Sequence, residues 1–255
     1  MMRHASLLAS SLLLFVFSVA GCKSPAGAKP EATTQYSTID SSTAGMISGT
    51  IHFAGTQPER LQIDMALDPA CLLSNPGVNL AEQYVIRDGK VANVFVYVKD
   101  GLGNKIYAAP QTAVVLDQKG CRYVPHVLGV MAGQPVEFRN SDPTMHNVHP
   151  APTVAGNSPF DVSQPPMGGT TQKTFAQPEL MMPVRCNNHP WMSAFINVAA
   201  NPFYSVSDND GHFEIKSLPP GTYTVVAVHE KLGSNSTQVT VKPQQTIEAN
   251  FTFTN

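Results

Sequence analysis

Charged residues are scarce in this sequence. Only 13% of its 255 residues are Asp, Glu, Lys or Arg, and no run of basic residues stands out. Because proteins that bind nucleic acid usually carry such a run, we do not expect a nucleic-acid partner. The chain also contains 21 prolines. Few charges together with many prolines favour a loop-rich β protein over a helical one.

The sequence also lacks a hydrophobic run long enough to cross a membrane as a helix. The run from Leu7 to Ala20 follows Arg3 and falls short of the roughly 20 residues that a bilayer requires. We interpret residues 1–21 as an export signal. The segment Val-Ala-Gly-Cys that ends at Cys22 resembles the lipobox of bacterial lipoproteins. This resemblance implies a mature protein lipidated at Cys22 on the periplasmic face of a membrane; a simple signal peptide is the alternative.

Cysteine is rare as well, but one of the four cysteines lies in an informative motif. Cys186, His189 and Met192 lie within one short segment, so a single loop could present all three. His146 lies upstream, after Asn140, and would have to come from another strand. One thiolate, two imidazoles and one thioether form the donor set of a blue-copper site. The motif therefore predicts one copper ion bound by these four residues.

Other kinds of site fit these residues less well. Methionine is an unusual zinc ligand, and structural zinc sites favour more thiolates. A binuclear copper centre would need a second cysteine close to Cys186. Nucleophilic catalysis by Cys186 and His189 would need an orienting partner, which the sequence does not identify. A site of this kind that holds another metal, or none, remains the alternative.

The residues around these motifs resemble cupredoxins. The similarity covers about residues 121–198, and the spacing from Cys186 to Met192 is like that of amicyanin. It implies a Greek-key sandwich with His146, Cys186, His189 and Met192 as ligands. It also implies that Asn147 lies behind the ligands, donates its backbone amide to the Cys186 sulfur and ties the two ligand loops together.

The two remaining cysteines are Cys71 and Cys121. With Cys22 assigned to lipid and Cys186 to metal, and with disulfides stable outside the cytoplasm, we expect these two to pair. Two buried free thiols are the alternative.

A second resemblance concerns the C-terminal part of the chain. Residues 208–213 (Asp-Asn-Asp-Gly-His-Phe) and 218–223 (Leu-Pro-Pro-Gly-Thr-Tyr) resemble the carboxypeptidase regulatory-like sandwich, a transthyretin-type fold. The first strands of that family are missing just before these residues. Matching patterns occur much earlier, at 49–51 and 91–98. We therefore favour one sandwich split in sequence, with the copper domain inserted into it; two tandem domains are the alternative.

The predicted organisation is all-β. A flexible linker rich in Ala, Ser, Thr, Pro and Gly spans 22–45, and the first part of the regulatory-like sandwich with a long connection spans 46–109. The copper domain spans 110–200, and the second part of the sandwich spans 201–255.

The predicted function is one-electron transfer by an exported, lipid-anchored blue-copper protein that is not an enzyme. Its partners would be a redox protein and, through the lipid, a membrane. We expect the ring of His189 to form the exposed edge by which the electron leaves. The alternative is a copper-binding protein for delivery or storage, or a module whose sandwich binds another ligand.

Overall fold

The structure, a computed structural model, describes residues 35–255. The predicted signal peptide (1–21), the lipidation residue Cys22 and the first part of the predicted linker lie outside the described residues. The described chain contains nineteen strands and one short helix, α1 (Pro69–Ser74). The prediction of an all-β chain with two sandwiches is confirmed. None of the described helices is long and apolar enough to span a membrane.

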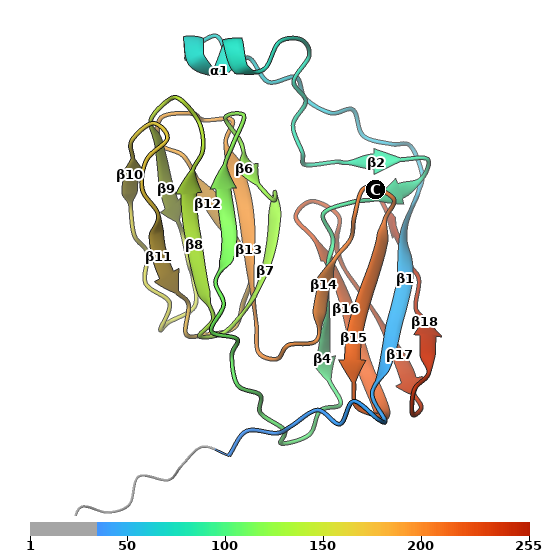
Figure 1. The fold of residues 1–255 in the computed structure, drawn as a ribbon. Helices are drawn as coiled ribbons and strands as arrows, with labels where there is room; N and C mark the ends of the chain where they lie inside the picture. The colour runs from blue at the N-terminus through green and yellow to red at the C-terminus, as the bar shows by residue number, and fades with distance from the viewer. Residues whose placement is uncertain (1–34) are drawn as a thin grey trace, which may run out of the picture. The chain divides into compact units, whose positions relative to one another are not determined.

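Strands from the two ends of the described chain build one sandwich, which we call the split sandwich (Figure 1). In its first sheet, β1 (Gly45–Ala54) pairs with β15 (His212–Leu218) and, in parallel, with β18 (Thr246–Glu248) and β19 (Phe251–Thr254). The same sheet continues through two short strands, β3 (Lys90–Val91) and β2 (Ile86–Arg87). The second sheet has the order β14 (Tyr204–Val206), β4 (Phe95–Asp100), β16 (Gly221–His229) and β17 (Gly233–Val241).

Buried and more exposed side chains alternate along β1, and the buried ones help to form the core of the split sandwich. Ile47 and Ile51 of β1 point inward and are fully buried, and they share one core with Val96 of β4 and Val225 of β16. Gly49 lies between the two isoleucines, where a Cβ would collide with the backbone carbonyl of Ala249. The absence of a side chain there allows the chain to pass β1 closely as it moves from β18 to β19.

The second sandwich, which we call the inserted sandwich, lies between β4 and β14 in the chain. One sheet has the order β10 (Val162–Gln164), β9 (His146–Pro150), β12 (Glu179–Arg185), β13 (Ser193–Ala199) and β7 (Val127–Met131). The other has the order β11 (Thr171–Thr174), β8 (Pro135–Asn140), β5 (Val114–Gln118) and β6 (Tyr123–Val124). Phe138 of β8 and Ile196 of β13 are fully buried in one core between the sheets.

The long connection between β1 and β2 crosses to the inserted sandwich. Residues 56–83 of this connection, which we call the covering segment, include α1 and a bridge between Gln62 and Leu80 (Figure 1). Met65 and Cys71 are buried in the core of the inserted sandwich, and a disulfide bond joins Cys71 to Cys121. The covering segment is therefore fixed to the end of the inserted sandwich at which β6 begins.

Residues 35–44 differ from the flexible linker that composition predicted for 22–45. Ile39 packs against the core of the split sandwich, and the side-chain amide of Gln244 donates to the carbonyl of Ser42 at 2.7 Å. One apolar residue and a few hydrogen bonds to Ile106 and Gln244 hold this stretch in place, although its sequence has no apolar periodicity.

Candidate metal centre

The ends of two neighbouring strands bring the predicted ligands together. His146 begins β9, and Cys186 directly follows β12, which pairs with β9. His189 and Met192 lie in the loop from β12 to β13, which the Met192 amide closes by donating to the His189 carbonyl at 2.9 Å. The Cys186 amide also donates to the Met192 carbonyl, at 3.3 Å. The loop is thus a compact turn that starts and ends in adjacent strands.

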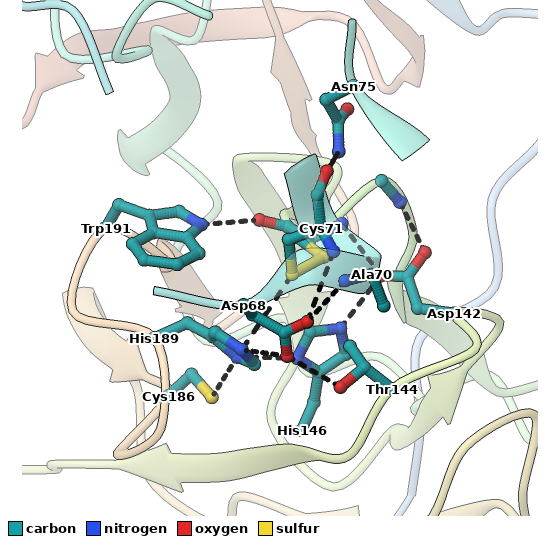
Figure 2. The surroundings of a disulfide bond; sticks show 12 residues. Asp68, Ala70, Cys71, Asn75, Asp142, Thr144, His146, Cys186, His189 and Trp191 are labelled. Atoms are coloured by element: carbon teal, nitrogen blue, oxygen red, sulfur yellow. Dashed lines mark hydrogen bonds and ion pairs between the residues drawn. A yellow bond between two sulfur atoms is a disulfide. The ribbon is translucent and has the colours of Figure 1, made fainter. Parts of the chain in front are cut away.

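Three of the four predicted ligands present their donor atoms to one point. The Nδ1 atoms of His146 and His189 are 3.0 Å apart, and Cys186 Sγ lies 3.6 Å from His189 Nδ1 (Figure 2). The three donor atoms all lie within 4.8 Å of one another. His146, Cys186 and His189 are 0%, 4% and 3% exposed, and Met192 of the same loop is 2% exposed. The group is a buried His–Cys–His cluster that could hold a metal ion.

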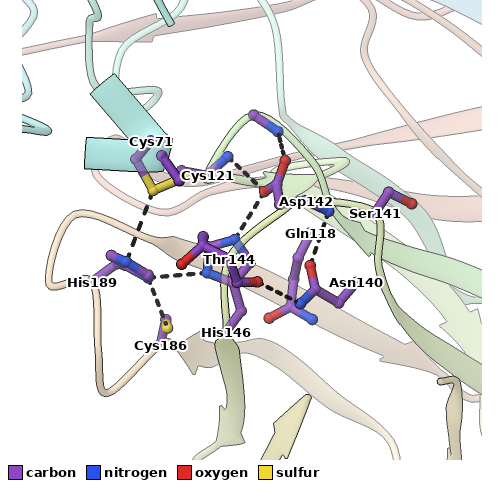
Figure 3. A network of polar contacts seen from close by, with 12 residues as sticks. Cys71, Gln118, Cys121, Asn140, Ser141, Asp142, Thr144, His146, Cys186 and His189 are labelled. Atoms are coloured by element: carbon purple, nitrogen blue, oxygen red, sulfur yellow. Dashed lines mark hydrogen bonds and ion pairs between the residues drawn. A yellow bond between two sulfur atoms is a disulfide. The ribbon is translucent and has the colours of Figure 1, made fainter. Parts of the chain in front are cut away.

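Two carboxylates fix the tautomers of the two histidines. Asp142 Oδ2 lies 2.8 Å from His146 Nε2, and Asp68 Oδ2 lies 3.0 Å from His189 Nε2 (Figures 2 and 3). A carboxylate only accepts, so each Nε2 carries a proton, and in the neutral rings both Nδ1 lone pairs face each other. Two converging lone pairs repel unless a cation or a proton lies between them. The network therefore prepares both rings to bind a cation through Nδ1.

Each carboxylate is itself held by other donors. Asp142 accepts from the backbone amides of Gly120 and Cys121 at 2.7 and 2.8 Å. Asp68 is the N-cap of α1, where it accepts from the amide of Ala70 at 2.8 Å, and it also accepts from the Thr144 hydroxyl at 2.7 Å.

Partial burial raises the pKa of Asp68, but these bonds and His189 outweigh it and lower the pKa to about 2. For Asp142, the bonds from His146 and from the two amides likewise outweigh burial and lower its pKa. Both groups are therefore anionic at neutral pH.

The surroundings of Cys186 favour its thiolate. Burial raises its pKa, but hydrogen bonds from His146 and from the amides of Asn147 and Asn188 outweigh it and lower the pKa to about 7. Burial in turn lowers the pKa of His146, but Asp142 and Cys186 outweigh it and raise the pKa to about 9. At neutral pH a substantial fraction of the sulfur is therefore in the nucleophilic, metal-binding thiolate form.

Asn147 lies where the cupredoxin resemblance placed it. Its amide donates to Cys186 Sγ at 3.3 Å, and its side-chain oxygen accepts from the Asn187 amide at 3.3 Å. Its side-chain nitrogen donates to Asp161. Asn147 thus links β9 to the loop that carries Cys186 and His189.

The expectation that His189 forms an exposed edge is wrong. Its ring is 3% exposed because the covering segment lies over it, with Asp68 on Nε2 and Cys71 Sγ 3.8 Å from the same atom. Trp191 packs beside it, with ring centroids 5.0 Å apart, and donates Nε1–H to the Cys121 carbonyl at 3.1 Å. The predicted disulfide partners Cys71 and Cys121 are bonded and form part of this cover (Figure 3).

Two further histidines near the motifs lie away from the donor atoms. His149 is exposed, and its Nδ1 lies 3.1 Å from the side-chain oxygen of Asn187. His126 is buried, and its Nε2 lies 2.5 Å from Glu230 of the split sandwich. His126 therefore connects the two sandwiches and does not reach the cluster.

Sequence reasoning missed the two carboxylates on the histidines. Asp142 lies four residues before His146, and Asp68 precedes Pro69 in the pattern of a helix N-cap, but neither pattern indicates a bond to a ligand. Asp68 is also the orienting partner that nucleophilic catalysis by Cys186 and His189 would require, contrary to the expectation that the chain supplies none. Because Cys186 is 4% exposed, a substrate would have no direct approach to its sulfur.

Comparison with known proteins gives partial similarities. The model of the carboxypeptidase regulatory-like domain matches residues 187–254. A Cu(I) form of an amicyanin mutant is 24% identical over 34% of this chain and 82% of its own, with a TM-score of 0.31. An oxidised amicyanin mutant is 21% identical over 41% of this chain and 98% of its own, also with a TM-score of 0.31.

A copper-containing nitrite reductase from Thermus scotoductus is 25% identical over 39% of this chain, with a TM-score of 0.32. The match covers 25% of the reductase, so the matched part of this chain spans a quarter of that enzyme. No curated protein sequence matches the chain.

Proposed function

We propose that this protein binds one copper ion in a blue type 1 site and carries single electrons as the metal alternates between Cu(II) and Cu(I). The observation that supports this most directly is the convergence of two Nδ1 atoms and one thiolate in a buried cluster whose tautomers are already fixed. Thiolate suits Cu(I) and imidazole suits Cu(II), so this donor set accepts either oxidation state. The residues present therefore fit copper.

In this proposal each ligand keeps one place during electron transfer. His146 and His189 bind through Nδ1, Cys186 binds through its thiolate, and Met192 supplies a weak thioether. Asn147 steadies the sulfur through its backbone amide. Copper supplies the redox change when bound. The protein supplies a cage that needs little rearrangement, because carboxylates hold both rings and a closed loop holds the sulfur.

The test is the visible spectrum of the copper-loaded protein. Wild type should show an intense thiolate-to-copper absorption band, Cys186→Ala should lack the band, and Met192→Ala should retain copper with a changed potential. Cys186→Ser is the matched control for side-chain volume, and it should also be colourless. A colourless copper-loaded wild type would contradict the proposal.

Copper storage or delivery is the second candidate, and the burial of His189 favours it. A carrier would have to exchange electrons through the cover or through another edge of the site. Rapid and reversible reduction with copper retained would support the carrier. Release of Cu(I) to a chelator on each reduction would support delivery.

We further propose that the protein is not an enzyme and acts outside the cytoplasm, with a redox protein as its partner. Its membrane attachment would be a lipid on Cys22. Fractionation of cells that express wild type or Cys22→Ser tests the attachment. Wild type should sediment with membranes, and the variant should not. Equal membrane fractions for the two proteins would rule out the lipid.

A further inference from the structure

The covering segment presents a sharply divided surface. Its inner side chains, Met65 and Cys71, are 2% and 0% exposed and pack into the inserted sandwich. Its outer side chains Leu67 and Leu73 are 77% and 81% exposed. The carboxylate of Asp68 lies 3.0 Å from His189 Nε2, and Cys71 Sγ lies 3.8 Å from the same atom. The segment thus joins a distant part of the chain to a candidate ligand.

Three independent contacts hold Asp68 in that place. Its Oδ1 accepts from the amides of Ala70 and Cys71 in the first turn of α1, at 2.8 and 3.3 Å. Its Oδ2 accepts from the Thr144 hydroxyl, two residues before His146, at 2.7 Å. The disulfide from Cys71 to Cys121 ties the same turn to the loop before β6 (Figure 3). The carboxylate therefore cannot move away from His189 without moving α1.

We propose that Asp68 is a positioning residue that keeps His189 bound to the metal in both oxidation states, and that the Cys71–Cys121 disulfide holds it there. This inference rests on the proposed copper site. A ligand histidine can leave a metal only if its ring rotates. Rotation of His189 would break its bond to Asp68, and the disulfide and Trp191 also crowd the ring.

The charge of Asp68 has a second consequence. A fixed anion beside a ligand favours the more positively charged state of the centre, which is the oxidised one. Removing the charge while keeping the shape should therefore raise the reduction potential. A purely structural role for Asp68 in α1 would leave the potential unchanged.

Asp68→Asn separates these roles, because the one oxygen of asparagine can still cap α1 in place of Oδ1. Its amide nitrogen would then stand in place of Oδ2, carries no charge and cannot accept from His189. The matched control is Asp64→Asn, four residues earlier, whose carboxylate accepts from the Ala66 amide and does not contact His189. We expect Asp68→Asn to shift the potential upward and Asp64→Asn to leave it unchanged. Equal potentials in wild type and both variants would overturn the proposal.

Retention of the metal is the second measurement. After reduction, Asp68→Ala and the double variant Cys71→Ala/Cys121→Ala should lose Cu(I) to a chelator about 10-fold faster than wild type. Equal rates of loss in all three proteins would contradict a positioning role for the segment.

A third measurement does not depend on copper. In the metal-free protein, the Nε2 proton of His189 should give a slowly exchanging NMR signal that Asp68→Ala removes. If wild type lacks the blue band but shows this signal, the proposed function fails while the contact stands. If wild type is blue but lacks the signal, the positioning role fails alone.

Discussion

Asp68 Oδ2 lies 3.0 Å from His189 Nε2, although 121 positions separate the two residues in the chain. The connection that leaves β1 thus passes over the inserted sandwich before it returns to the split sandwich at β2. As a result, His189 contacts a carboxylate and a disulfide sulfur from a remote part of the chain. The metal cluster therefore depends on both halves of the fold.

The disulfide between Cys71 and Cys121 should contribute strongly to stability. It closes a loop of 50 residues, for which the chain-entropy model gives about 4 kcal/mol. Urea unfolding of metal-free wild type and of Cys71→Ala/Cys121→Ala should differ by roughly that amount. Peptide mapping without reductant should find no free thiol at either position, and labelling of both cysteines would contradict the bond.

Acid should weaken the inserted sandwich through Glu179. This carboxylate is buried and accepts from Thr153 and Asn157. Burial raises the pKa of Glu179, but these hydrogen bonds outweigh it and lower the pKa below the ordinary value of 4.5. Because the folded pKa is the lower one, the stabilisation is complete above the unfolded pKa and is lost as pH falls through the folded pKa.

Denaturant unfolding of wild type and Glu179→Gln at several pH values tests this. Wild type should be more stable by about 2 kcal/mol at neutral pH, and the difference should shrink in acid. Glu248→Gln is the control, because that residue is exposed. A difference that stays constant down to about pH 3 would contradict the titration of Glu179.

The candidate metal ligands could be predicted from the sequence, because they belong to motifs of short and characteristic spacing. His146, Cys186 and His189 could be chosen because a copper site needs those residue types near adjacent strand ends, and the structure brings their donor atoms together. Few charges and many prolines indicated a β protein, and the described chain contains one short helix beside its strands.

Contacts between remote segments could not be predicted in the same way. The burial of His189 depends on residues 56–83. This segment has no apolar periodicity and contains three prolines. Asp68 has a local function as an N-cap, and that function explains its presence without any reference to a metal. The residues around Asp68 and those around His189 give no local signal that the two side chains meet in the fold.

A C-terminal fragment tests the pairing of the split sandwich. Residues 203–255 contain β14 to β19, but β15, β18 and β19 all pair with β1, and β14 and β16 pair with β4. Alone, the fragment would expose the core residues Phe213 and Val225. We expect circular dichroism to show an unfolded chain, whereas addition of residues 35–109 should restore β-structure. Cooperative unfolding of the fragment by itself would contradict this.

Asp142→Asn should weaken metal binding without unfolding the protein. Asp142 Oδ2 lies 2.8 Å from His146 Nε2, and the anion both fixes the tautomer and raises the basicity of Nδ1. Asparagine keeps the shape and one of the two acceptor oxygens, so it can still accept from the amide of Gly120 or of Cys121, but it loses the charge. Copper affinity, measured by competition with a chelator, should fall about 10- to 100-fold, as is usual when the hydrogen-bond partner of a ligand histidine is changed. Asp117→Asn is the matched control, since Asp117 bonds Ser141 beside Asp142 but does not contact His146. If both variants bound copper as tightly as wild type, the bond between Asp142 and His146 would have no part in holding the metal.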